Sequence, residues 1–549
     1  MSGASGHPDP AAGERAIPPD AATPDPWAVV ARTLLEHGVR QVLGLPDDDM
    51  ASLAAFRTAG IDFVWMSSQR TAVSAAAGQA IASRRPAVVV VGRGPGVAAT
   101  VPSLLEALAA HAPVLVLASG TASARLRDRA FQDAPTLALA APVTVWAERV
   151  ETGAALPGAI AEALARAGAV PGGPVLLEIP DGLTVEGEVR RPSTRMELPE
   201  LLSAFLAAER PVILVGGGAR GAVPPAALHE LADRAGAGVA VTASGRGAAS
   251  EGASTFLGVA GLYLPEESAA VVRDATVVLA VGTRLEETAV TGLPGDTPVL
   301  QVDAAVSGID RGRAGGHVIA DAGDALRALA EALPEARTTH AAWRRRVASA
   351  IPAAVRSERY RGSPLAAVLR SLADALPEGT VVVHENGLRD IWSYLAPVFR
   401  LPDGCTAVAP SELTTLGSGV AAAAGIALGG APLTVCICGD GAFSTLLPDL
   451  GLFARRPMPL LYVVLDDGGY GWLDSQARAA GLASDFTRGS LIEALLPSVG
   501  GSCDVLTVGD GGDPAPVLRD AVARAALGRV TLVRVPVGRA DVPPLNEAP

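Results

Sequence analysis

Two acidic, glycine-rich turns each follow a strongly apolar run. Gly439-Asp440-Gly441 comes after Leu433 to Cys438, and Asp466-Asp467-Gly468-Gly469 comes after Leu460 to Leu465. Glycine on both sides of Asp440 lets the backbone approach a phosphate while the carboxylate faces a cation. Carboxylates and bare backbone at two strand ends suit a hard divalent cation that bridges a diphosphate. The first turn alone would also fit an ordinary connection with solvated acids, but the second turn at this spacing favours a cofactor site.

Apolar runs of strand length alternate with helical segments along the chain, a pattern typical of doubly wound parallel sheets. The predicted strands of a first unit are Val42 to Leu45, Phe63 to Met66, Ala87 to Val91, Pro113 to Ala118, Val143 to Trp146 and Pro174 to Ile179. Those of a second unit are Val212 to Val215, Val239 to Thr242, Thr276 to Val281 and Pro298 to Val302. Those of a third unit are Thr380 to Val383, Thr434 to Cys438, Leu461 to Leu465 and Val530 to Val535.

The composition predicts where these units begin and end. We expect α/β domains at residues 25–185, 200–335 and 363–549, joined by linkers at 186–199 and 336–362. The first linker is charged and contains proline, which is typical of a connection. Residues 1–24 are mostly Ala, Pro, Gly and Asp without an apolar segment, so they predict a disordered tail rather than a signal peptide.

The charge and the cysteines limit the class of partner. A net charge of −13, with all 44 basic residues arginine, argues against nucleic acid or an anionic membrane as a partner. The charge-free stretch from Leu413 to Gly439 is long enough to cross a bilayer, but Gly, Ser and Pro interrupt it, so it does not predict a membrane span. The four cysteines lack the spacing of a disulfide framework. These observations predict a cytoplasmic protein that binds small molecules.

The two acidic turns resemble the fingerprint of thiamin diphosphate (ThDP) enzymes, in which Gly-Asp-Gly is followed by Asn-Asn. That family holds Mg²⁺ with the aspartate, the second asparagine and a backbone carbonyl two residues later. The resemblance therefore implies Asp440, Asp467 and the Gly469 carbonyl as metal ligands. Asp466-Asp467 departs from Asn-Asn, because it keeps oxygen ligands but adds negative charge beside the diphosphate. Further cofactor contacts are implied for Gly439, Gly441 and Ala442.

Other segments extend the resemblance over nearly the whole chain beyond the tail. Gly44-Leu45-Pro46 resembles the family's GVP turn, Gly94-Pro95-Gly96 its SGPG turn, and Ala130-Phe131-Gln132-Asp133 the AFQ stretch of its carboligases. This order is similar to that of the acetolactate-synthase-like members. The resemblance implies three doubly wound parallel-sheet domains, of which the first binds the pyrimidine of ThDP and the third binds its diphosphate.

The loop from Leu413 to Gly417 falls where the family places a bulky apolar side chain between the two rings of the cofactor, a role implied here for Leu416. The Thr414 carbonyl would then accept a hydrogen bond from the 4′-amino group. Glu385, Asn386 and Gly387 fall where the family begins to bind the diphosphate. Ordinary loops after strands are the alternative for both segments.

Gln69 marks the largest departure from the family. The family places a partner-subunit glutamate at this position, against N1′ of the pyrimidine, and no other acidic residue lies between Asp62 and Glu106. A glutamine can donate or accept a hydrogen bond but cannot exchange a proton, so we expect slow activation of the cofactor. Asp48 matches a catalytic aspartate of some decarboxylases, and Gln132 matches a glutamine that lines carboligase sites. A solvated turn acid and a loop residue are the respective alternatives.

The resemblance implies a ThDP- and Mg²⁺-dependent lyase or transferase that decarboxylates a 2-oxo acid and transfers the acyl anion to a second carbonyl. It also implies a homodimer or homotetramer. One alternative is a non-oxidative 2-oxo acid decarboxylase, since Gly44-Leu45-Pro46-Asp47 also resembles the turn of phosphonopyruvate decarboxylases. Another is a ThDP-binding protein with little or no turnover. The pattern Gly216-x-Gly218-x-x-Gly221 allows FAD without favouring it, because no acidic residue closes the next strand.

Overall fold

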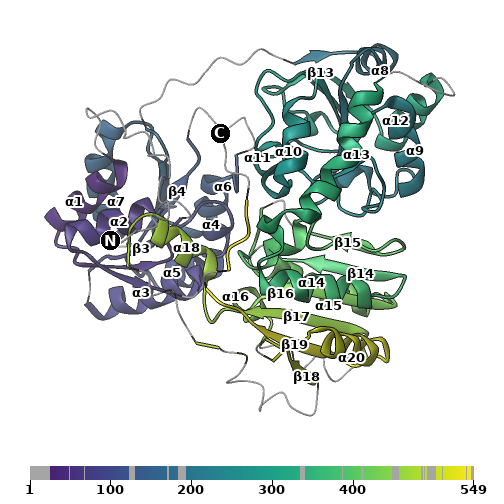
Figure 1. Cartoon of the computed structure of the whole chain (residues 1–549). Coiled ribbons are helices and arrows are strands. Elements are labelled where there is room, and N and C mark those ends of the chain that lie inside the picture. The colour runs from purple at the N-terminus through teal and green to yellow at the C-terminus, as the bar shows by residue number, and fades with distance from the viewer. Residues whose placement is uncertain are drawn as a thin grey trace, which may run out of the picture. The chain divides into compact units, whose positions relative to one another are not determined.

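The structure is a computed structural model of the chain. It describes residues 25–47, 50–66, 68–83, 85–122, 130–169, 172–183, 193–333, 340–385, 387–409, 413–447, 450, 457–483, 486, 489–490, 492, 503–509, 511–539 and 541–545. Three parallel sheets with helices on both faces form the described fold (Figure 1), which confirms the predicted class of three doubly wound domains. The residues divide into two compact units, one with 25–92, 96–122 and 136–183 and the other with 93–95, 130–135 and 193–545.

The first unit contains a six-stranded sheet with the order β2-β1-β3-β4-β6-β5. Side chains alternate between its faces: Val88 and Val90 join the core under α1 and α7, while Val89 and Val91 join the core under α3 and α5. The strands are β1 (Gln41–Gly44), β2 (Asp62–Trp65), β3 (Ala87–Val91), β4 (Val114–Gly120), β5 (Trp146–Arg149) and β6 (Val175–Pro180). The helices are α1 (Pro26–Glu36), α2 (Ala51–Ala59), α3 (Gln69–Ser83), α4 (Pro95–Ala98), α5 (Val101–Ala109), α6 (Thr136–Ala140) and α7 (Leu156–Ala167).

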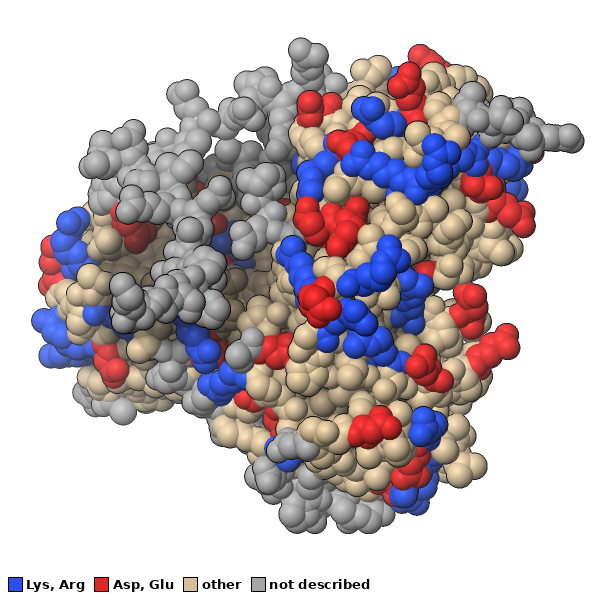
Figure 2. All heavy atoms as spheres, viewed as in Figure 1, with Lys and Arg blue, Asp and Glu red and all other residues tan. Residues whose placement is uncertain are grey.

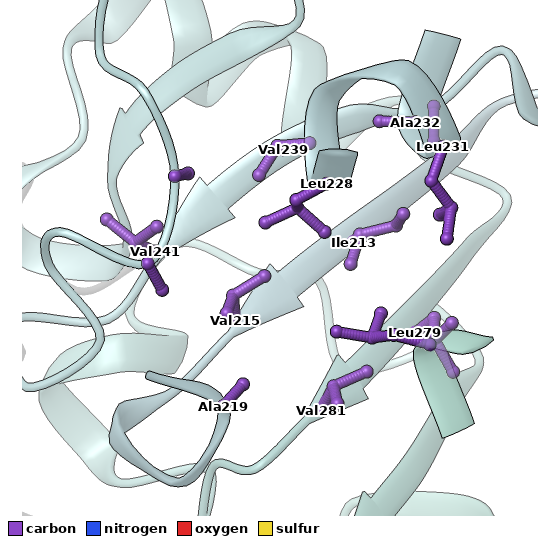
Figure 3. Packing of buried hydrophobic residues seen from close by; sticks show 14 of the residues in the cluster. Ile213, Val215, Ala219, Leu228, Leu231, Ala232, Val239, Val241, Leu279 and Val281 are labelled. Carbon is purple, nitrogen blue, oxygen red and sulfur yellow. The ribbon is translucent and has the colours of Figure 1, made fainter. Parts of the chain in front are cut away.

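The second unit begins with a seven-stranded sheet of order β10-β9-β8-β11-β12-β13-β7. Figure 3 shows Ile213 and Val239 of two neighbouring strands beside Leu228 of α9 (Pro225–Ala235), with Leu279 of the next strand in the same core cluster. The strands are β7 (Thr194–Arg195), β8 (Pro211–Val215), β9 (Gly238–Val241), β10 (Phe256–Val259), β11 (Val277–Val281), β12 (Val299–Asp303) and β13 (Ala314–Ile319). The helices are α8 (Leu198–Leu206), α9 (Pro225–Ala235), α10 (Glu266–Arg273), α11 (Glu287–Val290), α12 (Ala322–Ala332) and α13 (Ala341–Arg356).

The third sheet, in the same unit, has the order β15-β14-β16-β17-β19-β18. Its central strands β16 and β17 are both covered on two faces, so their residues read as continuous apolar runs. The strands are β14 (Thr380–His384), β15 (Thr406–Val408), β16 (Leu433–Gly439), β17 (Leu460–Asp466), β18 (Asp504–Thr507) and β19 (Thr531–Pro536). The helices are α14 (Pro364–Ala375), α15 (Ser418–Leu428), α16 (Asp440–Phe443), α18 (Gly471–Ala479) and α20 (Ala515–Ala526).

The structure differs from the sequence prediction mainly at sheet edges. The strand predicted at Val143 to Trp146 is wrong by three residues, because Ala141–Val143 forms a 3-10 turn with proline near its start and β5 is a partly polar edge strand. Within the predicted linkers, β7 pairs with β13, and α13 packs on the second sheet through Trp343 and Val347. The domain boundaries themselves stay predictions.

A fully buried ion pair joins the second sheet's connections to those of the third. Arg246 donates from Nε and Nη2 to the two carboxylate oxygens of Glu251 at 2.7 and 3.0 Å. It also donates to the carbonyl oxygens of Ser393 (2.5 Å) and Phe399 (3.1 Å) and contacts His384 Nε2 at 3.4 Å. Because these partners lie in connections of both sheets, the ion pair fixes the connections of the second sheet to those of the third.

Acidic and basic side chains are interspersed over the described residues visible in Figure 2. Among the described residues, no helix is both long enough and apolar enough to cross a membrane.

Candidate cofactor site

The first acidic turn lies where β16 ends and α16 begins. Gly439 is the N-cap of this short helix, and Asp440, its first residue, is buried. A Cβ on Gly441 would lie 3.0 Å from the Tyr470 ring and 3.5 Å from the carbonyl oxygen of Gly469. Glycine at position 441 therefore lets the two acidic turns approach each other.

The second acidic turn begins at the end of β17. Asp467 Oδ1 accepts a hydrogen bond from Gly469 N at 3.2 Å, and the carboxyl group of Asp467 lies close enough to that of Asp440 for the two to interact. Burial raises the pKa of Asp467, and the guanidinium of Arg389 opposes this rise. Two carboxyl groups this close repel each other unless a proton or a cation lies between them. The structure thus brings Asp440, Asp467 and Gly469 together, and this donor set fits a hard divalent cation.

The predicted cation ligands Asp440, Asp467 and Gly469 do not include a third acidic side chain. Within the part of the chain that the structure describes, no three His, Cys, Asp or Glu side chains are arranged to hold a metal. The predicted set has two carboxylates and takes its third ligand from the backbone.

Asp390 ties the end of β14 to the first acidic turn. Its fully buried carboxyl group accepts a hydrogen bond from the backbone N–H of Gly387 at 3.0 Å, and its Oδ1 lies 3.4 Å from the position of a Cβ on Gly439. Burial, with the nearby Glu385 as a smaller cause, raises the pKa of Asp390 to about 7. Gly387 and Gly439 therefore both lie beside Asp390, whereas Asn386 lies outside the described residues. The binding of a diphosphate by Glu385, Asn386 and Gly387 stays a prediction.

Glu385 holds the start of α15. Its Oε1 accepts from Gly417 N at 3.3 Å and its Oε2 accepts from Val420 N at 3.0 Å, and the residue is fully buried. A carboxylate at this position satisfies free backbone donors and interacts favourably with the helix dipole. Gly417 has φ +84°, and a Cβ there would lie 2.1 Å from Thr445 Oγ1, so a side chain would force the loop to move. The geometry therefore gives Glu385 a positioning role for the loop that precedes α15.

That loop combines strain with exposed apolar surface. Thr414 has φ +48° and Gln132 has φ +57°, a region that β-branched residues rarely adopt and that is often found at functional sites. Gln132 Nε2 donates to Thr414 Oγ1 at 2.8 Å, so the structure brings these two predicted site residues together. Leu416 is 45 % exposed, which fits a side chain that packs against a ligand.

Family comparisons agree with this geometry. The chain matches three family models described as "Thiamine pyrophosphate enzyme". They are the N-terminal TPP binding domain at residues 27–140, the central domain at 198–329 and the C-terminal TPP binding domain at 392–535. Each match falls on one of the three sheets, and together they span more than half of the chain. The chain belongs to the ThDP enzyme family.

Individual relatives place this ThDP family member among the acetolactate-synthase-like proteins. It is 28 % identical over 465 residues to the acetolactate synthase isozyme 2 large subunit of Escherichia coli, covering 80 % of this chain and 82 % of the relative. It is 25 % identical over 475 residues to the isozyme 3 large subunit of the same organism, covering 80 % and 81 %. The mitochondrial acetolactate synthase catalytic subunit of Aspergillus candidus is 26 % identical over 487 residues, covering 79 % and 69 %.

The remaining predicted residues belong to the first unit or lie outside the described residues. Gln69 is the first residue of α3 and is half-buried, and its Nε2 lies 3.8 Å from the position of a Cβ on Gly96. Asp48 lies outside the described residues. Gln69 therefore follows β2 as expected, and its role toward a cofactor stays a prediction.

Packing accounts for part of the glycine pattern in the central domain. A Cβ on Gly216 would lie 2.2 Å from the carbonyl oxygen of Gly282, and one on Gly218 would lie 3.1 Å from the same atom. These glycines are thus explained by close approach to the end of β11 without a bound dinucleotide.

Arginines that were not predicted from the sequence surround the acidic turns. Arg389 Nε lies 3.2 Å from Asp467 Oδ2, with the two side chains only 3 % and 5 % exposed. Arg539 Nε donates to the Asp467 carbonyl at 3.4 Å, and Arg534 Nε lies 2.6 Å from Asp466 Oδ2. The signal in the sequence was the adjacent charged pair Arg389-Asp390 in the connection that follows the buried strand β14.

Proposed function

We propose that this protein is a ThDP- and Mg²⁺-dependent carboligase of the acetolactate-synthase type. It would decarboxylate a 2-oxo acid and transfer the resulting acyl anion to a second carbonyl compound, which makes it a lyase and transferase. The main support is the similarity to acetolactate synthases over about four fifths of the chain. The approach of Asp440, Asp467 and Gly469 to one another supports a cation site in the same place.

Bound ThDP supplies the electron sink for loss of CO₂ from a 2-oxo acid. In this proposal Asp440, Asp467 and the Gly469 carbonyl hold Mg²⁺, which neutralises the diphosphate. Leu416 supports the rings of the cofactor, and Thr414, fixed by Gln132, presents its carbonyl oxygen to the amino group.

In this proposal Gln69 limits the rate at which bound ThDP loses its C2 proton and becomes active. As a neutral amide it orients N1′ by a hydrogen bond but cannot take up or release a proton there. Loss of a proton-transfer group typically costs about 10²- to 10⁴-fold in rate. Gln69 therefore favours a second candidate function, a ThDP-binding protein with little turnover.

We also propose that the enzyme is a cytoplasmic homodimer or homotetramer, with the Gln69 segment of one subunit completing the site of the other. Light scattering at micromolar concentration should give at least a dimer, whereas a fully active monomer would contradict this arrangement.

Product analysis with a panel of 2-oxo acids tests the reaction. With pyruvate, a carboligase forms CO₂ and acetolactate, while a simple decarboxylase forms CO₂ and acetaldehyde. No CO₂ from any 2-oxo acid, with ThDP bound, would contradict both reactions and support the binding protein.

A further inference from the structure

Each carboxylate of the second acidic turn has its own arginine. Arg389 Nε lies 3.2 Å from Asp467 Oδ2, and Arg534 Nε lies 2.6 Å from Asp466 Oδ2, which also accepts from Ser490 Oγ at 2.5 Å. Both arginines come from other strands or loops of the third sheet. The extra negative charge of Asp466-Asp467 is thus matched by two positive charges.

The two pairs differ in their exposure to water. Arg534 is 19 % exposed and lines a surface cavity of about 390 Å³ together with Asp466 and Asp467. Arg389 is 3 % exposed and Asp467 5 % exposed. Because charges interact more strongly away from water, the pair of Arg389 and Asp467 has the larger effect on the site.

Arg389 is also fixed in position by the backbone. Its Nη2 donates to the carbonyl oxygen of Arg539 at 2.8 Å, and its Nη1 donates to that of Asp541. The guanidinium is therefore held within ion-pair distance of Asp467 by contacts that do not involve Asp467, although Nε itself makes no hydrogen bond to a described residue. An asparagine at position 467 carries no charge, so it would leave the guanidinium charge of Arg389 unpaired beside a cation site.

We propose that Arg389 is a positioning and charge-compensating residue for the cofactor site, on the basis of the function proposed above. Its charge lies beside Oδ2 of Asp467, leaves the other carboxylate oxygen for the cation, and offsets the charge that Asp467 adds beside the diphosphate. The charges of Asp467 and Arg389 compensate each other. Changing Asp467 alone to the asparagine that is typical of the family therefore impairs cofactor binding.

A double-mutant cycle tests this inference. Calorimetry measures ThDP affinity at a fixed Mg²⁺ concentration for the wild type, Asp467→Asn, Arg389→Gln and the double variant. Each single change should weaken binding by about 10- to 100-fold, the usual cost of losing a partner of a metal ligand. The double variant should bind about 10-fold more tightly than Arg389→Gln, because the two effects are coupled. The Tm of the cofactor-free protein should also be higher for the double variant than for Arg389→Gln.

The exposed pair of Arg524 and Asp520, 3.0 Å apart, provides the matched control. The same Arg→Gln and Asp→Asn changes there should leave ThDP affinity unchanged. ThDP affinity of Asp467→Asn equal to or tighter than wild type, or additive effects in the cycle, would overturn the inference. If Arg389→Gln does not fold, Asp467→Asn decides alone, because it leaves in place the hydrogen bonds of Arg389 to the carbonyl oxygens of Arg539 and Asp541. A wild type without Mg²⁺-dependent ThDP binding would instead overturn the proposed function.

Discussion

The buried pair of Arg246 and Glu251 gives the largest stability effect that we expect from a single substitution. Arg246→Met removes the guanidinium and leaves the Glu251 carboxylate, 1 % exposed, with the Leu401 N–H at 2.8 Å as its described donor. The carbonyl groups of Ser393 and Phe399 lose their arginine donor as well. Removing one partner of a buried ion pair typically costs about 3–5 kcal/mol.

At about 2 °C per kcal/mol for a large domain, the Tm should fall by about 6–10 °C. Circular dichroism during heating measures this change, and the variant Arg246→Met/Glu251→Gln should recover more than half of it, because no unpaired charge remains. The control is Arg327→Met at the exposed pair of Arg327 and Asp324, where about 0.2–1 kcal/mol is expected. The reasoning is refuted if Arg246→Met melts within 1 °C of the wild type, or if the double variant melts no higher than the single one.

Three further outcomes follow from the candidate site and its surroundings. Asp440→Ala should weaken Mg²⁺-dependent ThDP binding by at least about 10- to 100-fold in calorimetry, and equal wild-type affinity with and without EDTA would contradict the site. Gln69→Glu should speed C2-proton exchange of bound ThDP by about 10- to 10³-fold, measured by NMR after acid quench; an unchanged rate with ThDP bound means that Gln69 does not face N1′. Burial and the nearby Arg246 hold the pKa of His384 well below its usual value, so the unfolded state binds more protons below pH about 6.5. The free energy of unfolding should therefore fall from pH 7 to pH 5 by up to about 1.4 kcal/mol per pH unit. Urea unfolding at several pH values should show that the free energy of unfolding of His384→Gln depends less on pH than that of the wild type.

The sequence predicted the central strands well because they are buried on both faces. Residues such as Val88 to Val91 and Leu461 to Leu465 must be apolar at every position, which makes the strand visible without any contact information. Edge strands lack this requirement. Trp146–Arg149 and Asp504–Thr507 carry polar residues and were misplaced or missed.

In the candidate site too, some residues could be predicted from the sequence and others could not. Asp440 and Asp467 could be predicted as neighbours because parallel strands bring their carboxyl ends to one edge of the sheet. Arg389 could not be assigned to Asp467, since its side chain is aimed by the carbonyls of Arg539 and Asp541, far along the chain. The left-handed conformation of Thr414 also depends on distant contacts, here with Gln132.

The exposed leucines of the loop before α15 have a consequence for how long the protein survives in the cell without its cofactor. Leu413 and Leu416 are 41 % and 45 % exposed beside a strained residue, and in the proposed function a bound cofactor would cover Leu416. A ligand that binds only the folded state also lowers the fraction of unfolded chains that proteases and aggregation remove. We therefore expect thiamin supply to set the abundance of this protein, and pulse-chase labelling should give a shorter half-life in thiamin-starved cells.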